Sequence, residues 1–199
     1  QFVFKPKIRY LMFGYLLFNL GFDLFLQSQS LYLTKVYLYS AQQISFFFII
    51  MGVIFAISMF VFHPKINKIL DVKTQIKMGI FIMGLGLLIY TWFNSNMFYS
   101  VSSKIKFTWL NAIVFYLATP FVTLNMTKIF SDITPGDTQG NLMGGLGQIS
   151  SISSILGALA MAVLFTINQH LNAVCGGALI LAGAFILRTL LNNNLTHEI

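Results

Sequence analysis

Asp23 is the residue of this chain best suited to chemistry, because it is a lone carboxylate inside a run of apolar residues over positions 10–32. Tyr15, Asn19 and Gln27 recur with it at intervals of four, so all four side chains share one face of a helix. A carboxylate at mid-bilayer costs at least about 2.5–3.5 kcal/mol unless it meets water, a partner or a proton. The stripe predicts a hydrated cavity in which Asp23 binds a coupling proton. The alternatives are a structural hydrogen bond to a neighbouring helix, or solvation near the membrane surface.

A second polar face is expected in the run 107–127, where four residues follow each other at spacings of three, four and four: Tyr116, Thr119, Thr123 and Thr127. Pro120 lies in the same run, and a proline inside a helix removes one backbone hydrogen bond and kinks the axis. A kink beside a polar face favours a moving helix that lines a cavity. The alternative is that the threonine hydroxyls bond the backbone of their own helix.

Small residues mark the run 142–167. They form one stripe, which consists of Gly147, Ser150, Ser154 and Gly157. Such stripes let membrane helices approach closely, so we expect this one to serve helix packing. Gln148 is offset from the stripe and can reach a cavity. The predicted cavity lining is therefore Asn19, Gln27, Tyr116, Thr119, Thr123 and Gln148.

These residues must be positioned by six apolar runs, each close to the length that a helix needs to cross a hydrocarbon core of roughly 30 Å. The runs cover residues 10–32, 44–62, 76–93, 107–127, 142–167 and 173–191. Backbone groups find no water in that core, so each run should be a helix, and the alternating pattern of a barrel strand is absent. The expected fold is an all-α membrane protein with a single six-helix transmembrane bundle over residues 1–199.

Composition excludes several other classes of protein. The chain is 57% hydrophobic and 9% charged, which leaves a soluble domain too little polar surface. Its net charge of +7 forms no aromatic-interleaved patch, so nucleic acid is not an expected partner. The single cysteine, Cys175, rules out an internal disulfide and a thiolate metal site. We expect no metal, no cofactor and no enzymatic activity, since no phosphate loop, carboxylate dyad or close histidine pair occurs.

Loop charges predict the orientation. With the N-terminus in the cytoplasm, nine lysines and arginines fall on the inner side and three, Lys35, Lys104 and Lys106, on the outer side. Short cytoplasmic loops carry such an excess, so both termini should be cytoplasmic. Tyrosine and tryptophan residues near the outer ends of the spans, such as Tyr32, Tyr90 and Trp92, are expected at the headgroup level. The chain begins at Gln1 on a segment typical of an interior stretch, and we expect it to be part of a longer polypeptide.

A faint repeat relates the two halves of the chain. The stretch Leu31-Tyr-Leu-Thr-Lys-Val36 matches Leu124-Asn-Met-Thr-Lys-Ile129 at an offset of 93 residues, and the same offset places Gly52 on Gly145. Three helices followed by three inverted relatives is a known construction of transporters. We therefore expect a 3+3 inverted repeat.

Two further stretches carry a resemblance to a known family. One is Ser30-Leu-Tyr-Leu33 leading to Ser40-Ala-Gln-Gln-Ile44, and the other is Tyr116-Leu-Ala-Thr-Pro120 followed by Thr134-Pro-Gly-Asp-Thr-Gln-Gly-Asn-Leu-Met-Gly144. With the helix count and orientation, they resemble the C-terminal half of a major facilitator superfamily transporter, most like the drug–proton antiporters of the tetracycline-efflux type. In the loop His63-Pro-Lys-Ile-Asn-Lys-Ile-Leu70, Asn67 and Lys68 occupy the family's acidic and basic positions, and the flanking glycines are missing.

The resemblance implies secondary active transport of a small organic molecule by alternating access, with the first and fourth helices lining the cavity. It implies a gating role for Asn67 and Lys68, and a partner half of six helices, from the same polypeptide or a second half-transporter chain. The expected location is the bacterial inner membrane, with the lipid bilayer around the bundle. Two alternatives remain: a non-transporting scaffold, in which Asp23 tolerates apolar substitution, and an intramembrane enzyme on lipids, whose turnover depends on Asp23 or a histidine.

Overall fold

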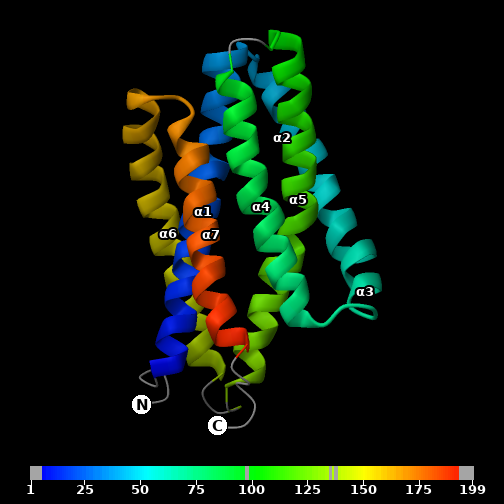
Figure 1. The fold of residues 1–199 in the computed structure, drawn as a ribbon, viewed down its shortest axis with the longest axis vertical. Helices are drawn as coiled ribbons and strands as arrows, with labels where there is room; N and C mark the ends of the chain where they lie inside the picture. Colours follow the sequence, from blue (N-terminus) through cyan, green and yellow to red (C-terminus); the bar gives the residue numbers. More distant parts are fainter. Residues whose placement is uncertain (1–5, 97–98, 135, 137–138, 193–199) are drawn as a thin grey trace.

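The computed structural model describes residues 6–96, 99–134, 136 and 139–192, and the regular elements in these residues are all helices (Figure 1). They are α1 (Pro6–Tyr37), α2 (Ala41–Ile57), the π-helical segment η2 (Ser58–Phe62), α3 (His63–Ile66), α4 (Val72–Ser95), α5 (Val101–Asp132), α6 (Gln139–Ile167) and α7 (Leu171–Asn192). Because α2, η2 and α3 follow each other without a break, the described residues form six helical rods. The all-α prediction is confirmed.

Five of the rods in the described residues are long and apolar enough to cross a membrane: Ile8–Tyr37, Ala41–Ile66, Val72–Ser95, Val101–Asp132 and Gln139–Ile167. The apolar part of α7 is shorter and covers Leu171–Leu187. The fold is thus consistent with an integral membrane protein.

The helices extend beyond the predicted apolar runs because polar residues cap them. Ser40 and Gln43 form a reciprocal capping box at the start of α2, in which the Ser40 backbone N–H donates to Gln43 Oε1 at 2.9 Å. Asp71 accepts from the Thr74 backbone N–H at the start of α4, and Ser100 accepts from the Ser103 N–H at the start of α5. The boundaries predicted from hydropathy at residues 44, 76 and 107 therefore lie inside the helices.

Helix α7 lies at the centre of the packing, against both α1 and α4, while α4 also packs against α5. Glycines set the contact between α1 and α7. A Cβ on Gly21 would lie 2.5 Å from the Gly176 carbonyl oxygen, and one on Gly183 would lie 2.9 Å from the Gly14 carbonyl oxygen. Only glycine permits this approach, and close backbone contact is how helices associate in a membrane.

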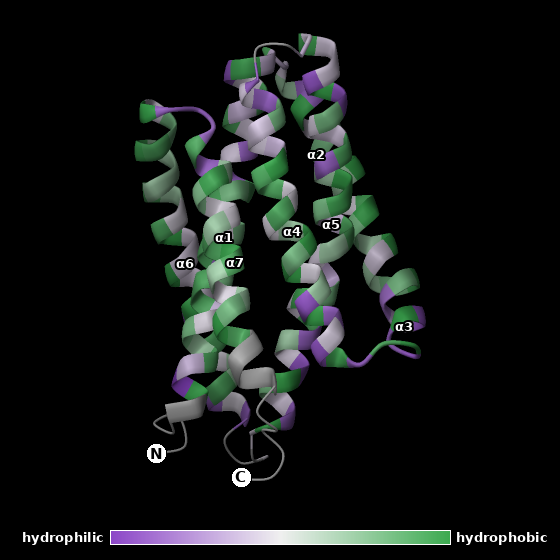
Figure 2. Cartoon of the chain, in the orientation of Figure 1, coloured by the Kyte–Doolittle hydropathy of each residue, from purple (hydrophilic) through white to green (hydrophobic). Residues whose placement is uncertain are grey.

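Helices α2 and α6 occupy outer positions, α6 against α1 and α2 against α5. Both are strongly apolar and largely exposed, with side chains such as Phe46, Ile49, Leu159 and Val163 pointing away from the bundle. Figure 2 shows that hydrophobic residues cover the middle of the helices and hydrophilic residues gather toward their ends. This is the surface that a hydrocarbon solvent requires.

Two hydrophobic clusters fill the interior. The larger one joins α1, α4, α5 and α7 through side chains such as Phe18, Leu87, Phe115 and Ile180. The smaller one fixes α2 to α1 and α5 through Leu33, Phe47, Met51 and Ala112. Phe18 and Phe47 are fully buried. The side chains of the predicted polar faces must fit around these clusters.

Candidate functional site

Asp23 lies where α1 and α6 touch. A Cβ on Gly157 would be 3.1 Å from the Asp23 Cβ, so a residue without a side chain lets α6 approach α1 at this level. The Asp23 side chain is 9% exposed. The carboxyl group is thus enclosed between two helices that both have the length and composition of membrane spans.

The polar surroundings of Asp23 come from α6. The Ser154 side chain lies beside the Asp23 carboxyl group. One turn further along α1, Gln27 Nε2 donates to the Ser154 backbone carbonyl oxygen at 3.0 Å. The second carboxyl oxygen, Asp23 Oδ2, is buried and has no hydrogen-bond partner among the described residues. An unsatisfied buried oxygen of this kind is a place for a proton, a cation or a water molecule.

The rest of the predicted α1 stripe has other partners. Asn19 Nδ2 donates to the Tyr15 carbonyl oxygen at 2.7 Å, so this amide is satisfied within its own helix. The Tyr15 ring packs edge-on against Phe130 of α5, with 5.6 Å between the ring centroids. Of the predicted face, Asp23 and Gln27 contact α6.

The polar face of α5 is a ladder of threonines bonded to their own helix. Thr119 Oγ1 donates to the Phe115 carbonyl oxygen at 2.8 Å, Thr123 Oγ1 to the Thr119 oxygen at 3.1 Å, and Thr127 Oγ1 to the Thr123 oxygen at 2.9 Å. This is the arrangement that the sequence left open as the alternative. Thr119 is buried, while Thr123 is half-buried and Thr127 exposed, so the ladder runs outward along one side of the helix.

Pro120 lies within α5 beside this ladder, as predicted, and Tyr116 is half-buried against both hydrophobic clusters. Ser58 of η2 faces the same turn of α5, and its hydroxyl donates to the Leu117 carbonyl oxygen at 2.6 Å. The π-helical segment of one rod and the proline turn of another thus meet at one level. Both are departures from regular α-helix that occur often at functional positions.

Aromatic rings of α1 and α5 pack against each other. Phe22 of α1 stacks on Phe115 of α5, with ring centroids 5.7 Å apart and an interplanar angle of 13°. Phe25 contacts the same Phe115 ring at a centroid distance of 4.8 Å. This layer joins α1 to α5, whereas Asp23 and Gln27 contact α6.

Gln148 and part of the small-residue stripe face outward. Gln148 lines a groove of about 490 Å³ with Met12 of α1 and the glycines at the start of α6. Gly147 is exposed, and a Cβ there would meet nothing within 4 Å. Ser150 is half-buried. Of the predicted packing stripe, Ser154 and Gly157 contact α1. The glycines of α7, which were not part of the predicted stripe, make still closer contacts with α1.

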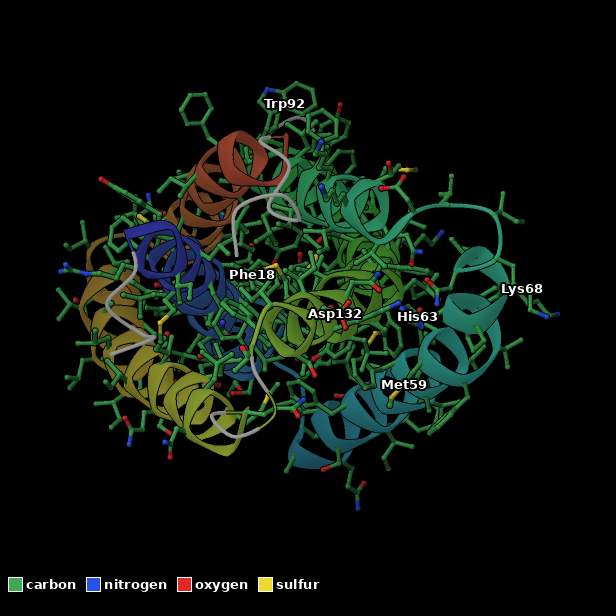
Figure 3. All side chains as sticks on the ribbon, turned by 90° about the horizontal axis from the view of Figure 1, so that it is seen from below. Phe18, Met59, His63, Lys68, Trp92 and Asp132 are labelled. Carbon is green, nitrogen blue, oxygen red and sulfur yellow. The ribbon has the colours of Figure 1, made fainter. Side chains whose placement is uncertain are left out.

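Asn67 of the predicted gating loop ends a chain of polar contacts. Gln75 Nε2 donates to Asn67 Oδ1 at 3.1 Å, and Asn125 Nδ2 donates to Gln75 Oε1 at 2.9 Å. His63 Nε2 lies 3.3 Å from Asn125 Oδ1. The network joins the turn after α3 to α4 and α5. Lys68 takes no part in it and extends away from the bundle (Figure 3).

This network and a second one at the opposite end of the bundle were not predicted from the sequence. Gln75 and Asn125 are almost fully buried. The sequence feature that could have identified them is an amide side chain inside an otherwise apolar helix. At the other end, the Tyr37 hydroxyl bonds both Asn94 and Thr108, and the Tyr32 hydroxyl lies 3.4 Å from His170 Nδ1. Tyr32 is buried among aromatic rings, and its depth at the headgroup level stays a prediction.

In the part of the chain that the structure describes, no group of three or more histidine, cysteine or acidic residues is placed to hold a metal ion. Pro135, Asp137 and Thr138 of the family-like polar stretch lie outside the described residues. Comparisons of the chain with protein families, with curated proteins and with solved structures find no match. The function must therefore be argued from the geometry.

Proposed function

We propose that this chain is half of a secondary active transporter that moves a small organic molecule by alternating access, driven by a proton gradient. The observation that carries the proposal is Asp23, a carboxyl group enclosed between two membrane-length helices with one oxygen unpaired. A group that is costly to keep charged in hydrocarbon is suited to take up and release a proton as its surroundings open and close. Ser154 of α6 lies beside it, and Gln27 of α1 bonds the Ser154 backbone carbonyl oxygen.

The order and packing of the helices support an inverted repeat. Helix α1 ends at Tyr37 and α5 at Asp132, 95 residues later; α2 begins at Ala41 and α6 at Gln139, 98 residues later. If α1, α2 and α4 are exchanged for α5, α6 and α7, the main packing pairs stay the same: α1–α7 becomes α5–α4, α1–α6 becomes α5–α2, and α4–α7 becomes itself. An odd number of crossings separates the triplets, so the second runs inverted, as in the major facilitator superfamily that the sequence resembles.

Charge supports an orientation with both chain termini in the cytoplasm. The start of α1 and the end of α7 lie at the same end of the bundle as α3 (Figure 1). Lys65 and Lys68 follow α2 at that end, and Lys73 and Lys77 open α4. If this end of the bundle lies in the cytoplasm, its lysines agree with the excess of positive residues in cytoplasmic loops. The proposed location is a bacterial inner membrane.

The exposed helices support a partner half. Gln148 and Gly147 face outward from α6, in or next to a groove that is open on this side of the bundle. A second set of six helices placed across α2 and α6 would cover this groove. The partner would be the N-terminal half of the same transporter, or a second half-transporter chain, with the substrate between the two.

The test is gradient-driven accumulation in sealed vesicles that carry the full-length protein, with a panel of radiolabelled compounds. An imposed pH difference should produce accumulation of at least one compound, and collapse of that difference should abolish it. The rival function is a non-transporting scaffold, which the threonine ladder favours because hydroxyls bonded to their own helix need no ligand. A scaffold predicts no accumulation, and unchanged cellular function when Asp23 and Thr123 are replaced by Leu and Val.

A further inference from the structure

Two buried amide side chains have carbonyl oxygens without a hydrogen-bond partner among the described residues. Gln29 of α1 is 6% exposed and Asn111 of α5 is 7% exposed, and the unpaired atoms are Gln29 Oε1 and Asn111 Oδ1. Asn111 Nδ2 donates to the Gly86 carbonyl oxygen of α4 at 2.8 Å, which fixes the nitrogen of this amide and leaves its oxygen unpaired. A buried acceptor without a donor is costly, so two of them call for an explanation.

The two amides lie at the same level of the bundle. Helices α1 and α5 run in opposite directions (Figure 1). Gln29 follows Phe25 by four residues and Asn111 precedes Phe115 by four, which is about one helical turn in each case. Both steps therefore lead the same way along the bundle. Because the rings of Phe25 and Phe115 contact each other, with centroids 4.8 Å apart, the amides one turn beyond them border the same region between α1, α4 and α5.

Aromatic rings lie next to this region. The Phe25 ring contacts Tyr90 of α4 as well as Phe115, with 6.0 Å between the Phe25 and Tyr90 centroids. Tyr90 lies one turn beyond Gly86, whose carbonyl oxygen bonds Asn111. The rings thus come from the same three helices that surround the two amides.

The electrostatics of the region favour a positive group. The spans that form it contain no lysine or arginine over residues 10–34, 78–95 and 107–127. Amide oxygens accept hydrogen bonds, and the faces of aromatic rings carry negative partial charge that attracts cations. An ammonium group meets both features, because it has several N–H donors and a positive charge.

We propose that Gln29 and Asn111 bind the ammonium group of an organic amine, whose N–H groups donate to Gln29 Oε1 and Asn111 Oδ1. This inference rests on the proposed function, because it names the chemical class of the transported molecule. Both oxygens are enclosed in this structure. The amine therefore reaches them when the helices move apart, as alternating access requires.

The test measures ligand binding to the purified full-length protein in detergent by isothermal titration calorimetry, with three probes of similar shape. Phenethylammonium has the charge and the N–H donors, phenethyltrimethylammonium has the charge without donors, and phenylethanol has a donor without the charge. The wild type should bind phenethylammonium about tenfold more tightly than either of the others, because hydrogen bonds from a charged donor are the stronger ones. Absence of phenethylammonium binding, or equal binding of all three probes, would overturn the proposal.

The two amides are tested by leucine, which has a similar volume and no acceptor. Gln29→Leu and Asn111→Leu should each weaken phenethylammonium binding by about tenfold. The matched control is Asn172→Leu, because Asn172 is also buried with an unpaired oxygen, but its amide nitrogen bonds the Met161 carbonyl oxygen of α6. This control should bind phenethylammonium as the wild type does. Full binding by Gln29→Leu or Asn111→Leu, or an equal loss in the control, would overturn the proposal.

Thermal unfolding separates a ligand site from a structural role. Gln29→Leu removes an unpaired buried oxygen, so it should be at least as stable as the wild type while it loses affinity. A large drop in its unfolding midpoint would indicate a structural role instead. Failure of the proposed function is distinguishable: amine binding without gradient-driven accumulation would count against transport and leave the site standing. Accumulation of another compound without amine binding would leave transport standing and overturn the site.

Discussion

The Ser58 hydroxyl donates a hydrogen bond of 2.6 Å to the Leu117 carbonyl oxygen, and this bond joins the π-helical turn of one rod to the proline turn of another. Ser58 is fully buried, so its hydroxyl has no water to bond. Ser58→Ala should lower the free energy of unfolding by about 0.5–1.5 kcal/mol. The measurement is unfolding in detergent, with Ser45→Ala, an exposed serine on the same rod, as the control. Equal stability of both variants would contradict a stabilising role for the bond.

The glycine contact between α1 and α7 predicts a larger loss. Gly21→Ala puts a Cβ 2.5 Å from a backbone oxygen of Gly176, so the helices must move apart, at a cost of about 1–3 kcal/mol. Gly52→Ala is the control, because a Cβ there meets nothing within 4 Å and alanine is the better helix former. Thermal unfolding should show a lower midpoint for Gly21→Ala and an equal or higher midpoint for Gly52→Ala. A tolerated alanine at Gly21 would show that the helices do not approach this closely.

Leu38 ends α1 in a left-handed conformation, with a φ of 55°. The Tyr39 N–H closes the helix by donating to the Leu33 carbonyl oxygen at 3.1 Å. Glycine is the usual residue at a left-handed position that ends a helix, which is the position of Leu38. The leucine side chain is 83% exposed and contributes little packing. Leu38→Gly should therefore raise the free energy of unfolding by about 1 kcal/mol. Leu38→Ala retains the Cβ and should give no such gain; an equal gain from both variants would exclude backbone strain as the cause.

His170 lies in the turn between α6 and α7, and it predicts a dependence of stability on pH. Burial, with a smaller contribution from the nearby positive charge of Lys104, lowers the pKa of His170 from its ordinary value of 6.5. The unfolded chain then binds a proton more readily than the folded one, so stability is highest above pH 6.5 and falls as the pH drops below it. His170→Gln should remove this part of the pH dependence. The unfolding midpoint, measured between pH 7.5 and 5, should fall more in the wild type than in the variant; parallel curves would contradict a lowered pKa.

Much of the fold followed from hydropathy alone, because a membrane span must be a long apolar helix and few other arrangements satisfy its backbone. The small-residue pattern was harder to interpret. The glycines of α6 were expected to pack, yet Gly147 is open, and Gly176 and Gly183 of α7 make the close contacts. A stripe of small residues marks a surface that can be approached, and the partner that approaches it depends on the tertiary fold.

The candidate site was anticipated in part. Four-residue spacing placed Asp23 and Gln27 on one helix face, and the structure brings both against Ser154. Spacing does not show which polar groups bond their own backbone, as Asn19 and Thr119 do. Nor does it reveal pairs such as Gln75 and Asn125, which are 50 residues apart in sequence and meet only because α4 packs on α5. Contacts of that kind need the topology as well as the periodicity.

The most direct test of proton-coupled transport compares Asp23→Asn with the wild type in vesicles that carry the full-length protein. Two activities are measured for a transported compound: accumulation driven by a pH gradient, and exchange of labelled for unlabelled compound without a gradient. Asp132→Asn, an exposed carboxylate at the end of α5, is the control. Asp23→Asn should lose gradient-driven accumulation and retain exchange, while Asp132→Asn retains both. Full gradient-driven accumulation by Asp23→Asn would contradict a role for Asp23 as the coupling group.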